Sequence, residues 1–180
     1  MLIFLPCCLS GVLSAFAWKF IYRFVLSALT GLSSPLGNAA WVIPGVVLII
    51  LWNGCGINML IYYAALKGVP QDIVEAAIMD GANRWQVFKN VTIPMIVPAF
   101  SICVTLNFTS LLKEFGTVMS ATGGGPAGSS KTFSVFIYEN LYTYGQAGYG
   151  QAIALLFLLL LVITGNLLTN FFRKREVEVI

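Results

Sequence analysis

Five charged side chains lie within one polar segment, residues 69–98, of a chain that is otherwise strongly apolar. They are Asp72, Glu75, Asp80, Arg84 and Lys89. Carboxylates and cations at this density can form charge-assisted hydrogen bonds with oppositely charged groups of a partner. The sequence has no histidine, which excludes a histidine general base and a histidine metal ligand. The chemistry offered here is therefore recognition of a partner.

A second set of polar residues lies inside or at the end of long apolar runs: Asn53, Asn58, Asn107, Ser110 and Glu114. An amide at membrane depth is costly unless it is paired or faces water. Two interpretations therefore stay open, hydrogen bonding between helices and the lining of a polar path for a solute. Asn53 and Asn58 are five residues apart and do not share one helix face. At most one of them is expected to point straight into a pore.

The elements that must position these residues are membrane helices. Of the 180 residues, 58% are hydrophobic and only 9% are charged, whereas a soluble domain averages roughly 25% charged residues. No run alternates with the period of a barrel strand, so helices must satisfy the backbone in lipid. We expect an all-α membrane protein with four spans, at about residues 2–25, 40–66, 93–112 and 147–172.

The first apolar run has a second interpretation, as a signal peptide. Residues 14–17 loosely resemble a cleavage site, but no positive residue precedes the apolar core, as a signal peptide requires. We therefore favour a spanning helix with its aromatic and basic residues at the far interface. The four cysteines lie in apolar runs without metal-ligand spacing, and we expect them to be small apolar residues without a metal: Cys7, Cys8, Cys55 and Cys103.

The polar segment itself predicts two short helices. Pro70 suits the first turn of a helix, and the acidic residues that follow favour its positive end. This helix is expected to continue to Met79 or Asp80 and to be stopped by Gly81.

A second short helix is expected to follow at once. Asn83 and Gln86 have the spacing of a capping box. The third span is then expected to begin afresh, with Asn90 or Thr92 as its cap and Pro94 in its first turn.

The distribution of basic residues predicts the orientation. Six of them lie on the side of the polar segment and the C-terminus, and four lie on the other side, so the positive-inside rule places loop 67–92 and the C-terminus in the cytoplasm. The first group is Lys67, Arg84, Lys89, Arg173, Lys174 and Arg175, and the second is Lys19, Arg23, Lys113 and Lys131. A Gly-rich loop and short helix, residues 114–146, are then expected outside.

The polar segment resembles the cytoplasmic signature loop of binding-protein-dependent ABC importer permeases, E-A-A-x3-G-x9-I-x-L-P. The matching residues are Glu75, Ala76, Ala77, Gly81, Val91, Ile93 and Pro94, of which Val91 and Ile93 are conservative departures. Downstream, residues 122–126 (TGGGP) and 148–152 (GYGQA) look like the sugar-importer branch, in particular the maltose and glycerol-3-phosphate permeases. Family members usually carry two further helices before this point, so we expect a truncated gene product, a misassigned start or a fragment.

This resemblance implies a type-1 permease-like helical bundle in the inner membrane, importing a sugar or sugar-like solute. It implies a cytoplasmic coupling helix that sits in a cleft of an ATPase dimer, a second permease subunit and an extracytoplasmic solute-binding protein. The chain itself would need no catalytic residue, metal or cofactor, because the partner binds ATP. The coupling residues would be Glu75, Ala76, Ala77, Asp80, Gly81, Arg84 and Pro94. For the substrate path, the polar residues of the spans remain the prediction: Asn53, Asn58, Asn107, Ser110 and Glu114.

Three other functions compete with this one. A channel or secondary transporter would use the same amides without an ATPase, but no acidic group lies well inside a span. A structural or non-transporting membrane fragment stays open because of the expected missing helices. An intramembrane enzyme is disfavoured because no Ser/His, paired Asp or metal constellation lies in the spans. The mild net charge of +3 fits basic residues at the membrane and not nucleic-acid binding.

Overall fold

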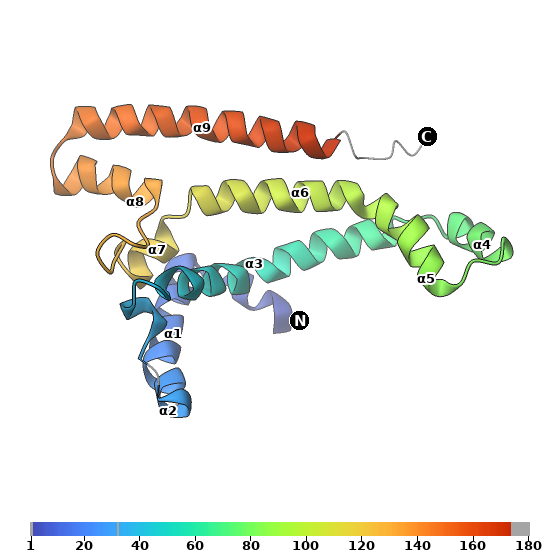
Figure 1. The fold of residues 1–180 in the computed structure, drawn as a ribbon, viewed down its shortest axis with the longest axis horizontal. Helices are drawn as coiled ribbons and strands as arrows, with labels where there is room; N and C mark the ends of the chain where they lie inside the picture. The colour runs from blue at the N-terminus through green and yellow to red at the C-terminus, as the bar shows by residue number, and fades with distance from the viewer. Residues whose placement is uncertain (1, 32, 174–180) are drawn as a thin grey trace. The chain divides into compact units, whose positions relative to one another are not determined.

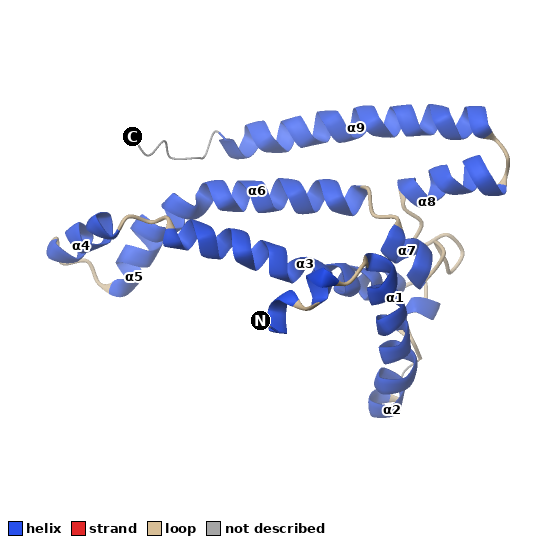
Figure 2. Cartoon of the chain, turned by 180° about the vertical axis from the view of Figure 1, so that it is seen from behind, coloured by secondary structure: helices blue, strands red, loops and turns tan. Residues whose placement is uncertain are grey.

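The computed structural model describes residues 2–31 and 33–173, and these residues contain helices and loops but no strand (Figures 1 and 2). The α-helices are α1 (Gly11–Phe20), α2 (Ser27–Thr30), α3 (Val42–Lys67), α4 (Gln71–Met79), α5 (Arg84–Val87), α6 (Ile93–Leu112), α7 (Gly116–Ala121), α8 (Phe133–Tyr138) and α9 (Ala147–Arg173). Three π-helical segments continue α1, α5 and α8: Ile21–Leu26, Phe88–Thr92 and Glu139–Thr143. Short 3₁₀ turns occupy Leu2–Phe4, Pro6–Cys8 and Pro35–Gly37.

Four helical stretches in the described residues are long and apolar enough to cross a membrane: Gly11–Leu29, Val42–Lys67, Arg84–Leu112 and Ala147–Phe172. At about 1.5 Å per residue, a helix of 26 residues extends roughly 39 Å, which exceeds the roughly 30 Å of a bilayer core. The second and fourth stretches lie within two residues of the expected ranges 40–66 and 147–172. Lys174 and Arg175, which contributed to the predicted orientation, fall outside the described residues.

The first long helix begins at Gly11 and not near residue 2, as the sequence had suggested. Ser10 has an extended backbone, and its side chain accepts a hydrogen bond from the Leu13 backbone N–H, so it caps the helix. Residues 2–8 form two separate 3₁₀ turns, the second of which starts at Pro6. The helix then continues past Val25 to Thr30, where Gly31 ends it with a φ of +67°.

The third long helix also starts elsewhere than predicted, because no break separates α5 from α6. Helical structure runs without interruption from Arg84 to Leu112, so neither Asn90 nor Thr92 caps a new helix. In the π-helical segment the Ile93 N–H donates to the Phe88 carbonyl, five residues back. This wider turn lets the helix pass Pro94, which has no N–H to donate. The non-helical part of loop 67–92 therefore ends at Asn83.

The chain divides into two compact units, which are described separately. The first comprises Met1–Gly56 and Ser110–Leu161. Its core joins α1, α3, α7 and α8 through the buried residues Ala15, Tyr22, Val42, Val46, Ile49, Val118, Ala121 and Val135. Tyr22 is only 6% exposed, and its hydroxyl donates to the Gly45 carbonyl at 2.9 Å. Trp18 packs against it with ring centroids 5.3 Å apart, so both aromatic side chains contribute to the core of this unit.

The second unit comprises Ile57–Thr109 and Val162–Ile180, as far as these are described. In it, the C-terminal part of α3 and the N-terminal part of α6 run side by side, and α4 and α5 lie at the ends of these helices (Figure 1). The polar segment is thus a helical turn between two long apolar helices. The fold positions it as a separate feature at one end of the unit.

Candidate functional site

Helix α4 is the central element of the polar segment, and its two ends are fixed by local sequence. Pro70 precedes the helix and Asp72 lies in its first turn, near the positive end of the helix dipole. At the other end Gly81 adopts a φ of +85°. The Ala82 N–H then donates to the Ala77 carbonyl at 3.0 Å and the Gly81 N–H to the Ile78 carbonyl at 2.9 Å, which is the Schellman arrangement. The predicted glycine stop is confirmed.

The predicted capping box of α5 is also confirmed. The Asn83 side chain accepts from the Gln86 N–H at 2.9 Å, and the Gln86 side chain accepts from the Asn83 N–H at 2.8 Å. Two reciprocal hydrogen bonds thus fix the chain direction four residues after α4 ends. Together the two motifs define a short corner made of α4 and α5.

The surface of this corner is open over most of its length. Glu75, Asp80 and Arg84 are exposed, and the side-chain bond described for this face joins Gln71 to Glu75 within α4 itself. Ala76 is exposed and Ala77 and Pro94 are half-buried, so all the predicted coupling residues except these last two face outward. Apolar groups are exposed beside them, most of all Met79 at 87% and Trp85 at 69%. Such a mixed apolar and charged surface suits a protein partner.

Two of the predicted substrate-path residues, Asn58 and Asn107, pair with each other in the second unit. The Asn107 amide nitrogen donates to the Asn58 oxygen at 2.7 Å, and the Asn58 nitrogen donates to the Asn107 oxygen at 3.2 Å. The Asn107 nitrogen also donates to the Cys103 carbonyl at 2.6 Å. The pair joins α3 to α6 and satisfies the amides at membrane depth. The structure therefore shows these two residues in the first of the two predicted roles, hydrogen bonding between helices.

The other asparagine of α3 has a different partner, in the first unit. Asn53 accepts a hydrogen bond from the Ser14 hydroxyl of α1 at 2.8 Å, and Ser14 is completely buried. Ser110 is exposed. Ser14 was missed by sequence reasoning because a single serine in an apolar helix gives no signal of its partner. The structure therefore brings Asn58 and Asn107 together and pairs Asn53 elsewhere.

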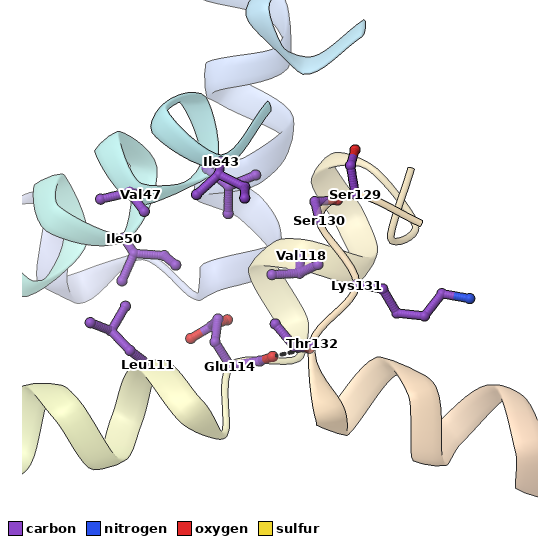
Figure 3. A pocket seen from close by; sticks show the side chains of 11 residues that line it. Ile43, Val47, Ile50, Leu111, Glu114, Val118, Ser129, Ser130, Lys131 and Thr132 are labelled. Carbon is purple, nitrogen blue, oxygen red and sulfur yellow. Dashed lines mark hydrogen bonds between the residues drawn. The ribbon is translucent and has the colours of Figure 1, made fainter. Parts of the chain in front are cut away.

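Glu114 lies in a cavity of about 240 Å³ within the first unit (Figure 3). Side chains of α3, with Leu111 and Val118, form an apolar wall, and residues 129–132 of the Gly-rich loop line another side. One carboxylate oxygen of Glu114 accepts from the Thr117 N–H at 2.9 Å, at the start of α7. The Glu114 carbonyl accepts from the Thr132 hydroxyl at 2.8 Å. Glu114 thus connects the end of α6 with the starts of α7 and α8.

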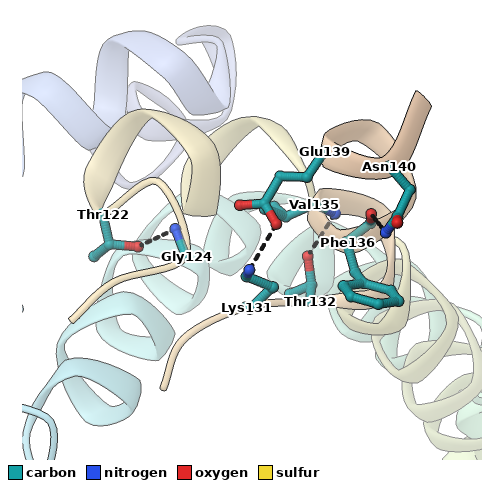
Figure 4. Close-up of polar contacts among 8 residues, drawn as sticks. All are labelled: Thr122, Gly124, Lys131, Thr132, Val135, Phe136, Glu139 and Asn140. Carbon is teal, nitrogen blue, oxygen red and sulfur yellow. Dashed lines mark hydrogen bonds and ion pairs between the residues drawn. The ribbon is translucent and has the colours of Figure 1, made fainter. Parts of the chain in front are cut away.

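The Gly-rich loop carries its own ion pair beside this cavity (Figure 4). The Lys131 ammonium donates to a Glu139 carboxylate oxygen at 2.6 Å, and this hydrogen bond raises the pKa of Lys131. Figure 3 shows the Lys131 side chain directed away from the cavity, whereas the Glu114 carboxylate projects between Leu111 and Val118. The cavity therefore contains a carboxylate whose nearest loop cation is already engaged elsewhere.

A family model and individual relatives match nearly the whole chain, and they agree on one family of proteins. The family model described as "Binding-protein-dependent transport system inner membrane component" matches residues 1–177. An osmoprotective compounds uptake permease protein of Synechocystis sp. is 35% identical, over 98% of this chain and 67% of its own length. A probable starch degradation products transport system permease protein of Thermoanaerobacterium thermosulfurigenes is 30% identical, over 97% of this chain and 62% of its own.

Solved structures resemble the fold. A bacterial ABC transporter involved in the import of the acidic polysaccharide alginate matches with a TM-score of 0.81 at 20% identity, over 96% of this chain and 63% of that chain. A bacterial alginate ABC transporter in complex with an alginate pentasaccharide-bound periplasmic protein matches with a TM-score of 0.70 at 21% identity, over 94% and 61%. The chain spans about three fifths of the length of several of these proteins.

Proposed function

Because the chain belongs to the family of binding-protein-dependent transport system inner membrane components, we propose that it is a membrane-spanning subunit of an ATP-driven importer for a sugar or sugar-like solute. Two of its relatives are named as a multiple sugar-binding transport system permease and an alpha-glucoside transport system permease. Four apolar helices of spanning length support placement across the inner membrane.

Helix α4 is the element that we propose to couple the chain to an ATPase subunit. The observation that carries this proposal is that α4 is a short helix, which begins after Pro70 and is ended by the Gly81 motif, with its charged and apolar residues open to a partner. Ala76 and Ala77 allow close approach of another backbone. Glu75 and Asp80 offer acceptors, and Arg84 offers donors, for charge-assisted hydrogen bonds. A compact element of this kind moves as a rigid body when its partner changes conformation.

The remaining partners follow from the same proposal. The α4 side and the C-terminus would face the cytoplasm, and residues 114–146 would face the opposite side. A second permease subunit would complete the pore, and an extracytoplasmic solute-binding protein would deliver the solute. The fold neighbour solved with a ligand-bound periplasmic protein supports the last of these. ATP would be held by the ATPase dimer and not by this chain.

The amide and hydroxyl residues of the spans are proposed as substrate contacts when the transporter changes state. Asn58 and Asn107 exchange hydrogen bonds with each other in this structure. The same groups can exchange them with sugar hydroxyls, since an amide has both donors and acceptors. Asn53, Ser110 and Glu114 stay predictions of the same kind.

Co-purification tests the coupling proposal. The full chain, tagged and extracted from its native membrane in mild detergent, should retain an ATP-binding subunit, quantified by mass spectrometry and ATPase activity. Glu75→Lys and Met79→Asp should each reduce the retained subunit at least tenfold, because the first reverses a charge and the second places a carboxylate at an apolar contact. Met79→Leu is the matched control and should retain it. If Met79→Asp and Met79→Leu retained equal amounts of the ATP-binding subunit, the proposal that α4 couples the chain to it would be refuted.

A further inference from the structure

The polar groups around the Glu114 cavity are nearly all engaged within the protein. The Ser129 hydroxyl donates to the Pro126 carbonyl at 2.6 Å, and the Ser130 hydroxyl donates to the Gly125 carbonyl at 2.7 Å. The Thr132 hydroxyl donates to the Glu114 carbonyl. These hydroxyls hold the loop in place and have no proton left to donate to a ligand, while their oxygens can still accept. The carboxylate of Glu114 is the charged group that is directed into the cavity (Figure 3).

That carboxylate has no ion-pair partner among the described residues, although one of its oxygens accepts from the Thr117 backbone N–H. Lys131 is among the residues that line the cavity, but its ammonium forms an ion pair with Glu139 and is directed away from the cavity (Figures 3 and 4). The adjacent Lys113 is exposed and is not among the residues that line the cavity. Among the described residues, the salt bridge that the structure contains does not involve Glu114. A ligand in the cavity would thus meet an apolar wall and one negative charge.

We propose that this cavity accepts one ring of a neutral, hydroxyl-bearing solute and disfavours an anionic one, with Glu114 as the specificity-determining residue. This inference rests on the proposed function and adds a charge class to its substrate. A cavity of about 150 Å³ is enough to bind benzene, so about 240 Å³ accommodates one six-membered ring with substituents. The apolar wall packs against the C–H face of the ring, and the carboxylate accepts from its hydroxyls.

An acidic ring would keep its ring hydroxyls but would place a second negative charge beside the Glu114 carboxylate. Two carboxylates about 6 Å apart repel each other even at the effective dielectric constant of about 20 that applies near a protein surface. Salt screens this repulsion only in part, because the distance is shorter than the Debye length of about 8–10 Å. The acidic polysaccharide named for the fold neighbour is therefore not the cargo that this cavity favours. The two chains share a fold at 20% identity and differ in the solute we assign.

Methyl glucoside and methyl glucuronide are the matched probes, because they differ only in a hydroxymethyl or carboxylate group at one ring carbon. Binding to the full chain in lipid nanodiscs is measured by saturation-transfer NMR titration. Methyl glucoside should bind about tenfold more tightly. Glu114→Gln should bring the ratio of the two dissociation constants to within about twofold. Glutamine keeps the acceptor for the Thr117 N–H and removes only the charge. Asp72→Asn, which removes an exposed carboxylate of α4 that does not line the cavity, should leave the ratio unchanged.

Three results would overturn the inference: an unchanged ratio in Glu114→Gln, equal binding of the two probes to wild type, or no binding of either probe at millimolar concentration. None of these depends on an ATPase, so the co-purification experiment can still succeed. Conversely, the full chain could fail to retain an ATP-binding subunit and still bind methyl glucoside more tightly than methyl glucuronide. That outcome would refute the coupling proposal and support the charge preference. The two failures are therefore distinguishable.

Discussion

The reciprocal amide pair between Asn58 and Asn107 should be worth a measurable coupling energy. Two hydrogen bonds join the side chains, at 2.7 and 3.2 Å. Interhelical hydrogen bonds in membrane proteins average about 0.6 kcal/mol and reach about 1.7 kcal/mol. Two bonds of this kind predict a coupling of about 1 kcal/mol. Asn107→Leu alone should cost more, about 1–2 kcal/mol, because Asn58 then loses this partner while its amide stays in an apolar setting.

A double-mutant cycle separates the coupling from the cost of each substitution. Asn58→Leu, Asn107→Leu and the double variant are unfolded by SDS in mixed micelles, and the free energy of unfolding is followed by tryptophan fluorescence. Thr109→Val is the matched control on the same helix, since the Thr109 hydroxyl donates to the Thr105 carbonyl of its own helix. Its cycle with Asn58→Leu should show no coupling. A coupling below about 0.3 kcal/mol between Asn58 and Asn107 lies within ordinary additivity and would refute the reasoning.

Three further substitutions test single contacts. Gly11→Ala places a Cβ 2.8 Å from a buried threonine hydroxyl of α7 and should lower the free energy of unfolding by about 1–3 kcal/mol, whereas Gly148→Ala, with open space around it, should not. Gly81→Ala meets no neighbour but keeps a φ of +85°, so hydrogen exchange should show α4 less protected by about 1–2 kcal/mol. Lys131→Met should cost less than about 1 kcal/mol in thermal unfolding, because its pair with Glu139 is partly exposed. The pKa of Lys131 is raised in the folded state, so the difference in stability between wild type and Lys131→Met should be constant from pH 6 to 9. It should disappear only as the pH rises through the folded-state pKa of Lys131, above about 10.5.

The parts of the site that depend on near neighbours in the chain could be predicted from the sequence. The Schellman end of α4 needs a residue that tolerates positive φ, which Gly81 supplies. The capping box needs only two side chains three residues apart, Asn83 and Gln86. Both contacts lie within six residues, so the local sequence contains all the information that they require.

Helix starts that depend on competing signals could not be predicted in the same way. Asn90 and Thr92 are good caps in isolation, but the continuous helix from Arg84 uses a π-helical turn to pass Pro94. At the N-terminus, an uninterrupted apolar run hid the cap at Ser10. Hydropathy reports which residues tolerate lipid, and it does not report where backbone hydrogen bonding begins.

Partners distant in sequence were beyond sequence reasoning for a different reason. Asn53 and Ser14 are separated by 39 residues, and Asn58 and Asn107 by 49. The cost of an unpaired amide in lipid predicts that a partner exists but does not identify it. Both interpretations of these residues were therefore open from the sequence, and pairing across helices required the structure.

The C-terminal end of α4, around Met79, is the surface that most strongly indicates a protein partner. Many apolar side chains on the long helices are exposed, which lipid alone can explain, but Met79 lies on a short polar helix that is not of spanning length and is 87% exposed. Burying such a side chain contributes about 1.5–3 kcal/mol, so leaving it exposed to water gives up that energy unless a partner covers it. A carboxylate there would forfeit this gain and add a desolvation cost, whereas leucine keeps the gain. The contrast between Met79→Asp and Met79→Leu therefore measures docking at this tip and not merely the integrity of the loop.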